Sequence, residues 1–272
     1  MIAPLESVEL FVSSAMRVDI VGGVGHLTLT QGARGNPVDD PFCDDLDRAA
    51  ELLTTDPRVR SILLKAEGSM FSVGGDLKGF QGPQSEWPAG ILRKTAKLNA
   101  AVLAFQAGDP PLVAAVSGVC AGGMVALVAG CDFVISASNA RFVSAYSGIG
   151  FSCDVGASVM LPRRMGDARA RRFLLLNETL AAPEALVAGL VDEVVELADL
   201  ASRSDSLAAG LAAGPTCALG QIRRLLSASG ERSLANQLSD EGHTLARLVG
   251  GGEASEGLTA FIERRPAVFA RT

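Results

Sequence analysis

Histidine is nearly absent from this sequence, which has only His26 and His243 among its 272 residues. A hydrolase built on a Ser–His or Cys–His pair needs a nucleophile in a suitable turn and a histidine to activate it, and the sequence offers no such combination. The chain also has a single tryptophan and a single tyrosine, and its formal net charge is −6. A basic surface with interleaved aromatic side chains is therefore not expected, which argues against nucleic acid and against an anionic membrane surface as partners.

The five cysteines show neither a C-x-x-C pair nor another metal-ligand spacing. We expect free thiols, mostly buried, in a reducing compartment, and no metal site. Residues 1–16 contain no lysine or arginine and so do not resemble a signal peptide. The apolar stretch at residues 110–132 is interrupted by proline, serine and glycine, which does not suit a membrane span. We predict a cytoplasmic protein.

Glycine and apolar residues are abundant, and one stretch that combines them dominates the sequence. Residues 110–132, PPLVAAVSGVCAGGMVALVAGCD, predict a buried strand over 112–116, a short glycine loop, and a helix that begins at Gly122-Gly123. The first amides of a helix have no internal partner, so they can bind an oxygen that carries negative charge. The alternative is a buried turn in which glycine only permits close packing, and this stretch taken alone favours that alternative.

A second glycine loop changes the balance. Residues 68–77, GSMFSVGGDL, also follow an apolar strand, at 61–65. Together, the F-S-x-G-G-D-L and S-G-x-x-x-G-G loops resemble those of the crotonase (enoyl-CoA hydratase/isomerase) superfamily, and the resemblance extends from about Val18 to Phe269. It implies an α/β fold of the ClpP/crotonase type, a superhelix of strand–strand–helix units. It also implies that the backbone N–H groups of Val73 and Gly123 form an oxyanion hole.

The chain divides into three parts by pattern. Residues 1–16 are expected to be a loosely attached N-terminal extension, and 17–197 to be the crotonase core with an acyl-CoA site. Residues 198–272 are almost wholly helical in pattern and are expected to mediate oligomerisation. The resemblance implies a homotrimer or a hexamer.

The acid and base residues decide which reaction an oxyanion hole serves. At the two positions where the family's hydratases carry glutamates, this chain has Ala126 and Tyr146. Asp154 lies eight residues beyond Tyr146, in a segment that most resembles the double-bond isomerases of the family, including those of phenylacetyl-CoA breakdown. The family's dehalogenases pair this aspartate with a histidine, and neither histidine here is in a suitable place. An alternative role for Asp154 is the N-cap of a following helix.

The resemblance implies further binding residues. The predicted acyl site comprises Asp76, Leu77, Gly122, Tyr146 and Phe151, with walls also drawn from residues 81–91. The predicted coenzyme A contacts are Arg34, Lys78, Phe261 and Arg264. No metal or redox cofactor is expected, because the coenzyme A thioester is the substrate. The predicted function is an enoyl-CoA isomerase; the alternatives are an enoyl-CoA hydratase and a non-catalytic acyl-CoA binder.

Overall fold

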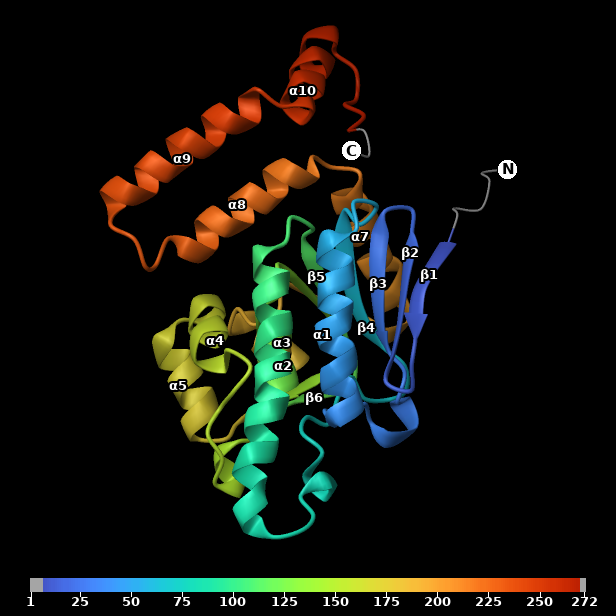
Figure 1. The fold of residues 1–272 in the computed structure, drawn as a ribbon, viewed down its shortest axis with the longest axis vertical. Coiled ribbons are helices and arrows are strands. Elements are labelled where there is room, and N and C mark those ends of the chain that lie inside the picture. Colours follow the sequence, from blue (N-terminus) through green and yellow to red (C-terminus); the bar gives the residue numbers. More distant parts are fainter. Residues whose placement is uncertain (1–6, 270–272) are drawn as a thin grey trace.

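The computed structural model of the protein describes residues 7–269 (Figure 1). Its strands are β1 (Ser7–Val12), β2 (Met16–Val21), β3 (Val24–Leu29), β4 (Ser61–Ala66), β5 (Leu112–Val116), β6 (Val119–Ala121), β7 (Phe133–Ala137), β8 (Arg141–Val143), β9 (Thr179–Ala181) and β10 (Glu193–Val195). Its α-helices are α1 (Asp40–Thr55), α2 (Trp87–Ala107), α3 (Gly123–Ala129), α4 (Ala157–Met165), α5 (Asp167–Leu175), α6 (Ala182–Val187), α7 (Leu200–Ala212), α8 (Thr216–Ala228), α9 (Leu234–Val249) and α10 (Gly252–Glu263).

Two sheets organise the molecule. The larger has seven strands in the order β1-β2-β3-β4-β5-β7-β10, antiparallel from β1 to β3 and parallel from β3 onward. The smaller has three strands in the order β6-β8-β9. The chain thus leaves the large sheet after β5, contributes β6 to the small sheet, and returns with β7. This alternation is the strand–strand–helix pattern of the crotonase fold.

The central strands are apolar along their whole length because both faces of the large sheet are covered. Side chains that alternate along β4 and β5 therefore belong to two different cores. Ile62, Leu64 and Val116 pack in the main core with α1, α2 and α3. Leu63 and Val113 face the other way and pack against α7.

The N-terminal segment differs from the expectation of a loosely attached extension. β1 pairs antiparallel with β2, from Ser7 opposite Val21 to Val12 opposite Arg17. Phe11 is buried, and the Arg48 guanidinium lies 4.6 Å from the centre of its ring. Residues 7–16 therefore belong to the core as an edge strand, and residues 1–6 lie outside the described part of the chain.

The C-terminal region also differs from the predicted division at residue 198. Helix α7 closes the outer face of the large sheet with Leu200, Ala208 and Ala212, so it is part of the core. Helix α8 is fastened to the core through Arg223, which bonds backbone carbonyls at Phe105, Gly108 and Pro110. Helices α9 and α10 then extend away from both sheets (Figure 1).

Two smaller expectations can be compared with the structure. Cys43, Cys120 and Cys131 are buried free thiols, Cys153 is partly buried, and Cys217 is exposed. Burial raises the pKa of the Cys43 and Cys131 thiols to about 12. Within residues 7–269, no helix is both long and apolar enough to cross a membrane.

Candidate active site

The two glycine loops lie side by side and are joined through their backbones. The N–H of Ser72 donates to Val119 O at 2.9 Å, and the N–H of Ala121 donates to Ser72 O at 3.0 Å. Glycine is required where the loops touch: a Cβ at Gly118 would collide with the carbonyl oxygen of Ser69. A Cβ at Gly74 would lie 2.9 Å from Ala121 O. The two glycine loops identified from the sequence therefore pack together as one continuous unit.

The amide of Val73 is not available for the predicted oxyanion hole. Its N–H donates to Gly35 O at 2.8 Å, because the loop at residues 32–37 runs alongside the first glycine loop. The Gly74 N–H donates to Ser72 Oγ at 3.1 Å. The Gly75 N–H, by contrast, has no acceptor among the described residues. On either side of it, Gly74 O accepts the Val38 N–H and the Asp76 N–H donates to Val38 O. The Val73 amide is therefore not free to act as the predicted donor, and the unbonded amide of this loop belongs to Gly75.

The second predicted donor, the Gly123 N–H, is not used by a hydrogen bond within its helix. Gly122 has φ 57° and ψ −131°, a conformation essentially restricted to glycine, and it directs the chain from β6 into α3. Gly123 is the first residue of α3, so its N–H has no partner within the helix. Gly75 and Gly123, whose amides have no acceptor among the described residues, both line the same cavity.

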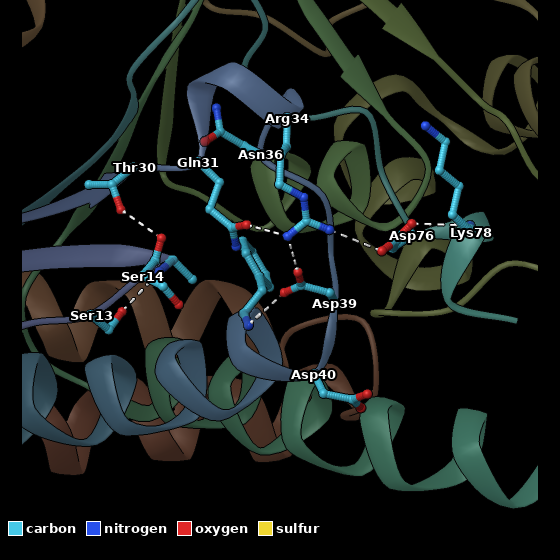
Figure 2. A network of polar contacts seen from close by, with 12 residues as sticks. Ser13, Ser14, Thr30, Gln31, Arg34, Asn36, Asp39, Asp40, Asp76 and Lys78 are labelled. Atoms are coloured by element: carbon cyan, nitrogen blue, oxygen red, sulfur yellow. Dashed lines mark hydrogen bonds and ion pairs between the residues drawn. The ribbon is translucent and has the colours of Figure 1, made fainter. Parts of the chain in front are cut away.

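A polar network fixes the first glycine loop (Figure 2). The Arg34 guanidinium donates to Asp39 Oδ2 at 2.7 Å and to Asp76 Oδ2 at 3.1 Å. Asp39 caps the N-terminus of α1, and Asp76 accepts the Lys78 N–H at 3.1 Å. Buried Asn36 donates to the carbonyl oxygens of Glu67 and Met70. The residue immediately after Gly75 is therefore tied to the start of α1.

A cavity of about 610 Å³ opens beside these loops. Its walls come from the two glycine loops, from the first half of α2, from α3, and from residues 145–155. The rings of Phe80, Trp87 and Phe151 lie together on one side, with centroids 5.2 Å apart for Phe80–Trp87 and 5.6 Å for Phe80–Phe151. Gln84, Trp87, Pro88 and Ile91, from the segment 81–91 that was expected to contribute walls, line this cavity together with Tyr146 and Phe151.

One carboxyl group is part of this wall within the described residues. Asp154 Oδ1 accepts a hydrogen bond of 2.8 Å from the Tyr146 hydroxyl. Burial raises the pKa of Asp154, and the Tyr146 hydrogen bond offsets part of that rise. The alternative role as an N-cap is wrong, because Gly156 caps α4 and no side chain accepts a hydrogen bond there. Asp154 is a buried carboxyl beside the cavity.

The structure brings together most of the predicted site. Leu77, Gly122, Gly123, Tyr146, Phe151 and Asp154 all line the cavity. Asp76 does not; its carboxylate is engaged by Arg34 and by the Lys78 amide. Ala126, at the position of one hydratase glutamate, is buried in the core.

The predicted coenzyme A contacts fall into two groups. Arg34 and Lys78 lie on the segments next to the glycine loops, and Figure 2 shows both near Asp76. Phe261 and Arg264 do not line the cavity. They belong to α10 and its C-cap, at the opposite end of the molecule from the segment that leads into α2 (Figure 1). Within one chain they are therefore not part of the cavity wall.

Sequence reasoning missed Gly75 and Phe80. A glycine pair does not reveal which of its amides is already bonded, and the segment at residues 77–86 has no periodicity that marks Phe80 as a wall residue. The proximity of Phe80 to Trp87 in the sequence is the one available signal.

The sheet topology, the paired glycine loops and the apolar cavity define an α/β protein of the crotonase type. Comparison with known proteins agrees: the family model described as enoyl-CoA hydratase/isomerase matches residues 19–272, and the chain belongs to this family.

Its relatives carry out different reactions. The chain is 33% identical to 1,2-epoxyphenylacetyl-CoA isomerase from Escherichia coli K12, over 91% of this chain and 95% of that protein. It is 30% identical to 4-chlorobenzoyl coenzyme A dehalogenase-1 from Arthrobacter sp., over 90% and 89%. An enoyl-CoA hydratase structure from Polaromonas sp. JS666 superposes with a TM-score of 0.88 at 29% identity, over 94% of this chain and 99% of that one. Family membership indicates acyl-CoA thioester chemistry without choosing among these reactions.

Proposed function

We propose that the protein is an acyl-CoA double-bond isomerase that moves the double bond of a 3-enoyl thioester to the 2-position through an enolate. The observation that carries the proposal is the single carboxyl group, Asp154, on a cavity wall that also presents the free amides of Gly75 and Gly123. One base and one oxyanion hole are the groups that this reaction needs. The likeness to the E. coli 1,2-epoxyphenylacetyl-CoA isomerase supports isomerisation of an acyl-CoA thioester as the class of reaction.

The proposed reaction is a proton transfer between two carbons. The Asp154 carboxylate removes a proton from C2, and the electrons of that C–H bond form the enolate. The Gly75 and Gly123 amides donate hydrogen bonds to the enolate oxygen, where the negative charge develops. Asp154 then returns its proton to C4, which leaves the double bond between C2 and C3. The raised pKa of Asp154 makes the carboxylate a stronger base than an exposed aspartate.

Hydration and dehalogenation are less well supported by the residues present. Splitting water across a double bond with two carboxyl groups requires a second one, and Ala126 and Tyr146 stand at those positions. The dehalogenase pairing of aspartate with histidine has no counterpart, since no described cavity residue is a histidine. His26 lies on β3 and His243 on α9.

The coenzyme A portion requires cations for its phosphates. We assign this role first to Lys78, because its ammonium makes no ion pair with any described residue, whereas Arg34 already binds two carboxylates. Phe261 and Arg264 do not line the cavity of their own chain, so we assign them to the site of another copy. Their proposed role in coenzyme A binding therefore depends on assembly.

The test compares Asp154→Asn with Lys78→Gln. Asp154→Asn should lower turnover of a 3-enoyl-CoA by a factor on the order of a hundred or more and keep its affinity for free coenzyme A. Lys78→Gln should weaken that affinity and raise KM, with little change in turnover at saturation. Trp87, the one tryptophan of the chain, lines the cavity, so its fluorescence reports acyl binding in both variants.

Three results would contradict the proposal. Near-normal isomerisation by Asp154→Asn would show that another group carries the proton. Rapid hydration of a 2-enoyl-CoA by the wild type would favour the hydratase. If a 3-enoyl-CoA binds but is not isomerised and its C2 protons do not exchange in deuterated buffer, the protein is a binder without catalysis.

A further inference from the structure

The backbone around Tyr146 fixes the position of its side chain. It follows Ala145, which has φ 57°, and it precedes a short 3-10 turn, Ser147–Ile149. The Tyr146 carbonyl accepts the N–H groups of Ile149 and Phe151, both at 3.1 Å. The turn is thereby closed on Tyr146, and its side chain, 9% exposed, is directed to the cavity wall.

Asp154, by contrast, lies in a segment whose backbone conformation gives its side chain little support. The segment 151–154 is not part of a helix or strand, and the next residue, Val155, has φ 53°. The Tyr146 hydroxyl is the one donor to the Asp154 carboxylate from another described side chain. The opposite side is the backbone of Gly123, where a Cβ would lie 3.2 Å from Asp154 Oδ1 and 2.9 Å from Val155 Cγ2. The carboxylate is held between a hydroxyl and a glycine.

The electrostatic surroundings of Asp154 are simple. Among the described cavity residues, the other titratable groups are Tyr146 and Cys153, which belong to the same segment. The walls from α1, α2 and α3 are uncharged; Leu46, Thr95, Leu98 and Met124 are examples. The Tyr146 hydrogen bond is therefore the main interaction that favours the ionised carboxylate against burial.

We propose that Tyr146 is a positioning residue for Asp154. Its hydroxyl donates a hydrogen bond to Oδ1, which leaves Oδ2 free to contact the substrate. The same hydrogen bond stabilises the ionised carboxylate. This rests on the proposed function, in which Asp154 carries the proton. Tyr146 itself transfers none, because burial and the neighbouring Asp154 raise the pKa of its phenol and keep it protonated.

The sequence allows an unusually clean experiment, because Tyr146 is the only tyrosine in the chain. Growth on 3-fluorotyrosine replaces this one residue, and the electron-withdrawing fluorine makes the phenol a stronger donor. Tyr146→Phe removes the hydroxyl and little else. Asp154 should titrate at higher pH in Tyr146→Phe and at lower pH in the fluorinated protein, with opposite displacements of the acidic limb of kcat/KM.

Direct readouts separate this role from a structural one. The ¹⁹F resonance of the fluorinated protein should follow Asp154 ionisation, and Asp154→Asn should abolish that titration. Turnover of Tyr146→Phe should fall about tenfold, as expected for the loss of one hydrogen bond to a charged group, with KM and free coenzyme A affinity nearly unchanged. The control is Ser147→Ala, in the same turn, whose hydroxyl donates to Leu174 O instead. Its pH profile should match that of the wild type.

The possible failures are distinguishable. If Asp154→Asn is inactive but both tyrosine replacements leave the pH profile in place, the proposed function stands and Tyr146 is only a wall residue. If Asp154→Asn is fully active, the proposed function is wrong, and the ¹⁹F titration alone decides whether Tyr146 controls the Asp154 carboxyl. If both tyrosine replacements displace the acidic limb of the kcat/KM profile in the same direction, the proposal is overturned.

Discussion

The Asp154 side chain faces a cavity made mainly of apolar side chains and glycine backbone, with a single hydroxyl as its partner. Desolvation of a carboxylate is unfavourable, and one hydrogen bond does not fully compensate for it. The protein keeps an acid where a neutral side chain would be more stable. A functional requirement explains such a residue better than a structural one.

This arrangement predicts a pH-dependent gain in stability for Asp154→Asn. Because the pKa of Asp154 is raised in the folded state, folded wild type binds the proton more tightly than the unfolded chain does. Its stability therefore falls as pH rises through that pKa. The asparagine of the variant carries no such penalty, and its amide oxygen can still accept the Tyr146 hydrogen bond. The variant should melt at a higher temperature than wild type at neutral pH.

The advantage should shrink as pH falls and vanish below the ordinary aspartate range, about pH 3.8. Thermal unfolding of both proteins over the range from about pH 3 to 8 measures this difference. A variant that is less stable than wild type at neutral pH would mean that the carboxylate contributes to folding after all.

At the scale of elements, the first glycine loop contains two adjacent glycines with different tasks. Gly74 has φ 81° and touches the second loop, whereas Gly75 has an ordinary φ and open space where a Cβ would be. The first glycine permits packing between the loops. The second leaves an amide free beside the cavity.

Matched substitutions should separate these tasks. Gly74→Ala should destabilise the protein by about 1–3 kcal/mol, because it combines an unfavourable φ with a Cβ against Ala121 O. Gly75→Ala should unfold at nearly the wild-type urea concentration and retain its N–H. Urea unfolding of the two variants checks the prediction, and equal losses of stability would contradict it.

Much of the element order could be predicted because the signals are local. The apolar runs at 61–65 and 112–116 mark buried parallel strands, and the leucine spacing after residue 199 marks helices. Strand β1 was not predicted, since an edge strand with one exposed face and a charged Glu9 has no such run. The site was predictable as a pair of loops with one carboxylate.

Its detailed bonding was not predictable, for a physical reason. The free amide is Gly75 rather than Val73 only because Gly35, from a distant loop, accepts the Val73 N–H. The Tyr146–Asp154 hydrogen bond depends on Ala145 and Val155 adopting positive φ, which side chains of these types do not signal. The first feature depends on a contact between distant segments, and the second depends on backbone conformations that the residue types do not indicate.

At the scale of the whole molecule, the C-terminal helices expose many apolar side chains. They include Ile222, Leu226, Leu234, Leu238, Leu245, Val249, Leu258, Phe261 and Ile262. Such a surface on helices that leave the core is unfavourable in an isolated chain. We propose that copies of this chain cover it, as a homotrimer or a hexamer, with α8 to α10 at the contacts.

The double substitution Leu238→Glu and Leu245→Glu, on one face of α9, should therefore dissociate the assembly. Light scattering coupled to size exclusion should give three or six times the protomer mass of 28.0 kDa for the wild type and a smaller value for the variant. Val12→Glu, an exposed apolar position on β1, is the control and should leave the mass unchanged. A monomeric wild type at micromolar concentration would exclude the assembly.

The cover that α7 provides for the outer face of the large sheet has a consequence for synthesis on the ribosome. All the described cavity residues lie between Val38 and Val155, so the whole wall has been made before α7 exists. Until Leu200, Ala208 and Ala212 have emerged, however, no helix covers Leu63, Val113 and Ile135 on the outer face of the sheet. A nascent chain in this interval carries a nearly complete active site together with an uncovered apolar sheet. This interval is when the growing polypeptide most needs a chaperone or rapid elongation.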